Sequence, residues 1–97
     1  MVNLIHLELT RNKIRDITPL KALIRLEFLF IGNNNIESVS ALSGLTGIRY
    51  LVLSDNEIAD ISSLGKLSKL EDLSVQNNPI TDYSAVEHVK NLHKKWR

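Results

Sequence analysis

The sequence contains no cysteine, so neither a disulfide bond nor a thiolate zinc site can stabilise its fold. No apolar run approaches the roughly 18 residues that a membrane-spanning helix needs, and the first residues do not form a signal peptide. The net charge is only +1, whereas a domain that binds nucleic acid is normally strongly basic. These absences argue against membrane insertion and against nucleic-acid binding.

Residues that could support catalysis are also scarce. His88 and His93 are five positions apart, so they do not share a helix face as a pair of metal ligands would. His6 and Glu8 lie on one face of a predicted strand, but no serine, cysteine or third group completes a catalytic arrangement with them. No phosphate-binding glycine motif occurs. We therefore expect no enzyme activity, no metal site and no cofactor.

One pattern recurs four times at a period of 22 residues, without insertion or deletion. Its strand positions are Leu4, Leu26, Ile48 and Leu70, then Leu7, Leu29, Leu51 and Leu73, then Leu9, Ile31, Leu53 and Val75. Apolar and polar residues alternate around each second leucine, which is the pattern of a half-buried strand. So short a strand cannot bury its apolar face alone, so we expect the copies to stack into a parallel sheet on the inner side of a curved solenoid.

This pattern resembles the leucine-rich repeat family. The resemblance covers residues 2 to about 89 and is carried by Leu4-x-x-Leu7-x-Leu9-x-x-Asn12-x-Ile14 and its three echoes. The 22-residue period is similar to that of bacterial internalin-type surface proteins and of the phosphatase-1 regulatory subunit. The resemblance implies a right-handed α/β solenoid of four repeats, about 4–25, 26–47, 48–69 and 70–91, forming one domain over residues 1–97.

Two columns of polar residues are interpreted as structural. The asparagines at the turn after each strand are expected to bond neighbouring loops in a ladder, because their short side chains both donate and accept hydrogen bonds; they are Asn12, Asn34, Asn56 and Asn78. The hydroxyl residues before each Leu-x-x-Leu are expected to cap short helices on the convex side; they are Thr18, Ser40, Ser62 and Ser84.

The two ends of the repeat array carry different predictions. At the C-terminus, Ser84-x-x-Glu87 has the form of a capping box, and Val86, Val89, Leu92 and Trp96 follow at helical spacing. We therefore predict a C-terminal cap helix over about residues 84–97. At the N-terminus nothing comparable precedes Leu4, so either a cap has been removed or two molecules associate as a homodimer through this edge. Because the chain starts inside a repeat, at Met1, we also expect a trimmed or engineered sequence.

The side chains that flank the strand leucines are predicted to face the concave side of the solenoid. The residues in question are His6, Phe28, Tyr50 and Asp72 in one column, and Glu8, Phe30, Val52 and Ser74 in the next. The middle two strands thus carry three of the five aromatic side chains. An apolar patch with a polar rim is typical of a protein interface. Cross-strand aromatic pairs also stabilise sheets, so a structural role for the same residues remains an alternative.

The leading hypothesis is a module for protein–protein recognition through the concave sheet. Phe28, Phe30 and Tyr50 would anchor a protein partner, with specificity from the polar rim. The alternative is a structural or engineered scaffold that self-associates through its N-terminal edge. The resemblance to internalin-type repeats favours the bacterial cell surface or secretion over the cytoplasm, while the partner, organism and compartment are not specified by these residues.

Overall fold

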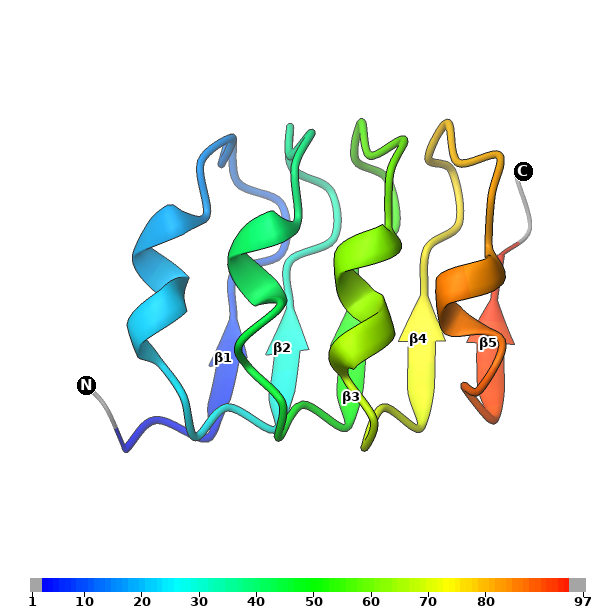
Figure 1. The fold of residues 1–97 in the computed structure, drawn as a ribbon. Helices are drawn as coiled ribbons and strands as arrows, with labels where there is room; N and C mark the ends of the chain where they lie inside the picture. Colours follow the sequence, from blue (N-terminus) through cyan, green and yellow to red (C-terminus); the bar gives the residue numbers. More distant parts are fainter. Residues whose placement is uncertain (1–2, 95–97) are drawn as a thin grey trace.

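A computed structural model describes residues 3–94, which form a single parallel sheet backed by short 3-10 helices (Figure 1). The strands are β1 (His6–Glu8), β2 (Phe28–Phe30), β3 (Tyr50–Val52), β4 (Asp72–Ser74) and β5 (Asn91–His93). The helices are η1 (Thr18–Ala22), η2 (Ser40–Leu42), η3 (Ser62–Lys66) and η4 (Ser84–Val86). The strands lie in sequence order from β1 to β5. Each strand is therefore joined to its neighbour by one helical return path, which is the predicted solenoid.

The strand register matches the sequence period. His6 pairs with Phe28, and Phe28 pairs with Tyr50, so neighbouring strands are offset by the 22 residues of the repeat. The leucine at the centre of each strand points into the core, and Leu29, Leu51 and Leu73 are at most 1% exposed. The residues on either side of it point to the opposite face because side chains alternate along a strand. This alternation confirms the predicted split between core and concave positions.

The asparagine ladder is present. The Oδ1 atom of Asn56 accepts a hydrogen bond from the Ile36 amide at 3.0 Å, and its Nδ2 atom donates to the Ile31 and Leu53 carbonyls at 3.1 and 3.0 Å. Asn34 and Asn78 bond in the same way and, like Asn56, are buried. A buried polar side chain must find partners, and each asparagine finds them in its own repeat and in the preceding one. The ladder therefore stabilises the stacking of one repeat on the next.

The turn residue just before each ladder asparagine has a left-handed backbone. Arg11, Asn33, Asp55 and Asn77 have φ between 57° and 61°. Asparagine and aspartate tolerate this conformation better than other residues with a side chain. The tight turn it produces directs the chain away from the sheet at the same point in each repeat.

The helix caps differ from the prediction. The residue before each helix makes no side-chain capping hydrogen bond. Instead, the backbone amides of Thr18, Ser62 and Ser84 donate to the carboxylate two residues earlier, at 2.9 Å in each case. The acceptors are Asp16, Asp60 and Asp82, and in the second repeat Ser38 accepts from the Ser40 amide. The side chain that accepts the hydrogen bond thus lies two residues before the predicted position, because an aspartate closes this turn with its own carboxylate.

These bonds lower the pKa of each carboxyl group. The hydrogen bonds from Thr18, side chain first, lower the pKa of Asp16, and the bonds from Ser62 and Ser84, backbone first, lower those of Asp60 and Asp82. The ionised carboxylate is the better acceptor, so the turn favours the charged form. The three carboxylates are therefore part of the convex scaffold.

The predicted cap helix over residues 84–97 is wrong for the part of it that the structure describes. The helical turn η4 ends at Val86, and a fifth strand follows, with Leu92 paired with Leu73. From Asp72 to its partner Asn91 the offset is 19 residues, compared with 22 between the earlier strands. The last repeat has no residue equivalent to Leu70 of the preceding repeat. Leu92 therefore lies in the strand three residues earlier than the 22-residue period predicts. Trp96, assigned to the cap in the prediction, lies outside the described residues.

The first repeat is more exposed than those that follow. Leu4, Leu7, Leu9 and Ile14 are only partly buried, whereas Leu26, Leu29, Ile31 and Ile36 at the same positions are fully buried. Asn12 is exposed, and its Nδ2 atom donates only to carbonyls of its own repeat, the Leu9 and Thr10 oxygens. Among the described residues, β1 is an edge strand of the sheet.

Candidate protein-binding face

The eight residues predicted for the concave face come together on one side of the sheet. His6, Phe28, Tyr50 and Asp72 are consecutive partners across β1–β4, and Glu8, Phe30, Val52 and Ser74 are consecutive partners two residues further on. Parallel strands lie about 5 Å apart, so each column is a continuous row of side chains. We call these eight residues the concave patch.

The first row is a stack of rings. The His6 and Phe28 ring centroids are 5.6 Å apart, and those of Phe28 and Tyr50 are 5.0 Å apart with only 5° between the ring planes. Phe28 is therefore covered on both faces by its neighbours. Such pairs contribute about 0.5–1.5 kcal/mol each beyond the area they bury. Phe28 and Tyr50 are half-buried, whereas His6 at the end of the stack is exposed.

Phe30 has a different environment in the second row. Among residues 3–94 its one aromatic neighbour is His6, with ring centroids 5.3 Å apart and planes tilted by 46°. Its strand partners are Glu8 on β1 and Val52 on β3. Phe28 is thus stacked between two rings, whereas Phe30 is not.

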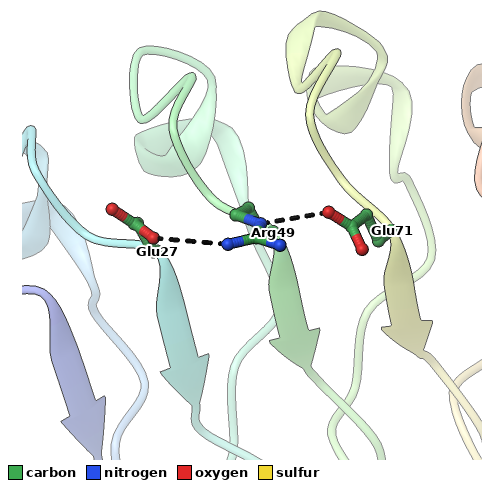
Figure 2. A network of polar contacts seen from close by, with 3 residues as sticks. All are labelled: Glu27, Arg49 and Glu71. Atoms are coloured by element: carbon green, nitrogen blue, oxygen red, sulfur yellow. Dashed lines mark hydrogen bonds and ion pairs between the residues drawn. The ribbon is translucent and has the colours of Figure 1, made fainter.

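A cross-strand ion-pair network lies at the start of the middle strands, and the sequence reasoning did not include it. Figure 2 shows Arg49 between Glu27 and Glu71, each residue immediately preceding its strand. Arg49 Nε lies 3.0 Å from Glu71 Oε2, and Arg49 Nη1 lies 3.8 Å from Glu27 Oε1. The hydrogen bond to Glu71 raises the pKa of the Arg49 guanidinium, with its charge as the second cause. Opposite charges at one register position in neighbouring strands are the signal that would have revealed this network.

The network also contacts the ring stack. The Arg49 guanidinium carbon lies 5.6 Å from the centroid of the Tyr50 ring, within the range of a cation–π contact. Two carboxylates hold this guanidinium, so Arg49 acts as a positioning residue for Tyr50.

Polar residues lie at both ends of the concave patch, on β1 at one end and beside β5 at the other. On β1, the carboxylate of Glu8 accepts hydrogen bonds from the side chain and the backbone amide of Thr10, and the side-chain bond is the main reason that the pKa of Glu8 is lowered. At the other end, Asp72 Oδ1 lies 3.3 Å from His93 Nε2. The sequence predicts a helix at His93, whereas in the structure His93 extends the second row, because β5 pairs with β4.

Among residues 3–94, no three histidine, cysteine or acidic side chains gather as a metal site would require. Within that same range, no helix has the length and apolar character needed to cross a membrane. Among residues 3–94, the exposed large apolar side chains are Ile5 and Ile24, at 47% and 63%; both lie in the first repeat, outside the strands.

Comparison with known families agrees with this geometry. A model described as leucine-rich repeats in two copies matches residues 2–44 and again residues 46–88. The chain belongs to the leucine-rich repeat family. Proteins of this family generally act in protein–protein interaction. No curated protein sequence matches the chain significantly.

Solved structures of internalins are similar to the chain over nearly its whole length. Internalin C2 of Listeria monocytogenes superimposes with a TM-score of 0.89 at 37% identity, over 94% of this chain and 40% of the internalin. Internalin F of the same organism gives 0.86 at 38% identity, over 94% of this chain and 28% of that protein. The chain thus spans less than half of either relative. A leucine-rich repeat protein of Leptospira interrogans, LIC12759, shares the fold, with a TM-score of 0.83 at 23% identity over 96% of this chain and 26% of that one.

Proposed function

We propose that the protein recognises a protein partner through the concave patch. The observation that supports this most strongly is the ring stack on the sheet face, because it is held rigid by its neighbours and by Arg49 rather than covered by another part of the described chain. A rigid apolar surface loses little conformational entropy on binding. Aromatic side chains at the centre of an interface are also its commonest energetic anchors.

The polar residues around the rings supply specificity in this proposal. Glu8 at one end and Asp72 with His93 at the other present charge and hydrogen-bonding groups next to the apolar centre. An apolar centre with a polar rim is the usual organisation of a protein interface. The similarity to internalins supports a location on the bacterial surface or in the secreted fraction.

A capture experiment with matched variants tests the proposal. The chain is immobilised and incubated with protein extracts, and bound proteins are quantified by mass spectrometry for the wild type, Phe30→Ala and Lys66→Ala. Lys66 lies on η3, on the helical side of the solenoid, so its variant is the control. We expect specific partners to be lost with Phe30→Ala and retained with Lys66→Ala. Retention by Phe30→Ala and loss with Lys66→Ala would place the binding surface on the convex side.

Self-association through the N-terminal edge is the second candidate. It is favoured by the edge position of β1 and by the partial exposure of Leu7 and Leu9, since an uncovered edge strand tends to pair with another chain. Light scattering over a concentration series tests it, with Leu7→Lys as the disrupting variant. A molecular mass that stays monomeric at every concentration would exclude this candidate.

A further inference from the structure

The charge of the concave face is uneven. Among β1–β5 and the residue before each strand there are four carboxylates and two cations, namely Glu8, Glu27, Glu71 and Asp72 against Arg49 and Lys90. Arg49 is shared between two of the carboxylates, and Asp72 lies against His93. Glu8 forms no ion pair with any residue between 3 and 94, and its hydrogen bonds come from Thr10.

Glu8 lies beside a ring that is not stacked between two others. It is the strand partner of Phe30, whose ring is tilted by 46° from that of His6. The carboxylate is exposed and its bonds from Thr10 favour the charged form. A negative charge next to an accessible aromatic face is complementary to a planar cation, because a guanidinium can pair with the carboxylate and pack against the ring at once.

The protein already contains this arrangement one strand away. Arg49 bonds to the Glu71 carboxylate at 3.0 Å while its guanidinium carbon lies 5.6 Å from the Tyr50 ring centroid. There the carboxylate, the guanidinium and the ring all come from the chain itself. At Glu8 and Phe30 the carboxylate and the ring are present, but no guanidinium of residues 3–94 forms an ion pair with the carboxylate; Arg11 contributes only a weaker charge effect on Glu8.

We propose that the concave patch binds a segment of its protein partner that presents an arginine side chain, with the guanidinium paired to Glu8 and packed on Phe30. An apolar residue next to that arginine would contact Val52, the other strand partner of Phe30. The inference rests on the proposed function and adds to it the chemistry of the partner. The ion pair between Glu8 and the partner's arginine is exposed to solvent. It therefore contributes to specificity and association rate more than to total affinity.

Selection from a phage-displayed library of random dodecapeptides on the immobilised protein tests this inference. We expect arginine to be enriched beside an apolar residue in the selected peptides. Glu8→Gln should weaken their binding by about two- to five-fold, and raising NaCl from about 0.05 to about 0.5 M should reduce the difference between the two proteins. Exchanging the peptide arginine for lysine should weaken binding to the wild type. Glu87→Gln, a change on the opposite side after η4, is the control and should bind as the wild type does.

The outcomes distinguish the arginine assignment from the proposed function on which it rests. Peptides that lose binding to Phe30→Ala but bind Glu8→Gln normally, without arginine enrichment, would overturn the arginine assignment and leave the concave patch as the interface. Peptides that are insensitive to both variants, or a library that yields no binder, would overturn the proposed interface as well. Circular dichroism of each variant confirms that the fold is retained.

Discussion

Removing one asparagine from the middle of the ladder should destabilise the protein far more than removing the one at its end. In Asn56→Ala the Ile36 amide loses its acceptor, and Ile36 is fully buried. The three carbonyls that Asn56 serves each keep a second donor, since Ile31 also accepts from Asn34, Leu53 from Asn78 and Ser54 from the Asn33 backbone amide. One orphaned buried amide costs about 1–3 kcal/mol, and weakening three further bonds adds about 0.5–1.5 kcal/mol in all. We therefore expect a loss of about 2–4 kcal/mol.

Asn12→Ala is the matched control, because Asn12 occupies the same position in the first repeat and is exposed. Its side-chain amide donates to the Leu9 and Thr10 carbonyls, and the Leu9 oxygen also accepts from Asn34. The expected loss is below about 1 kcal/mol. Urea unfolding followed by circular dichroism gives both free energies, provided that the slope of the transition is unchanged. Equal losses in the two variants would refute the reasoning, because the ladder would then contribute nothing beyond the local turn.

Three further predictions follow from other parts of the structure. Arg49→Met should weaken partner binding less than Phe30→Ala does and leave the fold intact, as measured by titration calorimetry; unchanged binding would remove Arg49 from the positioning role. Since the pKa of Asp60 is lowered from its ordinary value of 3.8, its stabilising effect is present above that value and is lost as the pH falls below it. Asp60→Asn should therefore flatten the acid dependence of unfolding; an identical acid transition would contradict this. In hydrogen exchange, the Val75 and Asn91 amides should be protected, because they donate to His93 and Glu71 at 2.9 Å; fast exchange at both would argue against β5.

The architecture was predictable because two independent patterns agree in it. The 22-residue period sets which residues lie side by side, and the alternation along each strand sets which side they face. Leu29 and Phe28 are adjacent in sequence, and the pleat alone assigns one to the core and the other to the concave patch. The ladder was predictable for the same reason, since a polar residue that recurs at a buried turn needs a recurrent partner.

The C-terminal prediction failed because one spacing fits two structures. Val86, Val89 and Leu92 are three residues apart, which is the spacing of a helix face and also that of successive core positions in these repeats. Nothing in the spacing shows that a strand begins three residues early. The pairing of Leu92 with Leu73 depends on the sheet already formed by the preceding repeats. Tertiary context therefore decided between strand and helix here.

The helix caps and the Arg49 network were predictable from the sequence to different degrees. Asp60 and Ser62 both recur at the repeat period, so periodicity could not distinguish the acceptor from the residue that donates to it. The pairing of Arg49 with Glu71 was recoverable from opposite charges in adjacent strands. Its contact with Tyr50 was not, because it depends on the side-chain conformation of an exposed arginine.

We infer that Phe30 is kept on the concave face for binding and does not belong to the core. The most direct measurement compares Phe30→Ala with Leu29→Ala, its neighbour at 0% exposure, in free energy of unfolding and in affinity for a captured partner or selected peptide. We predict that Leu29→Ala loses about 2–5 kcal/mol of stability. Phe30→Ala should lose less than about 2 kcal/mol of stability but about 2 kcal/mol of binding free energy. A loss of stability in Phe30→Ala as large as that in Leu29→Ala, with binding by the folded protein unchanged, would contradict the account.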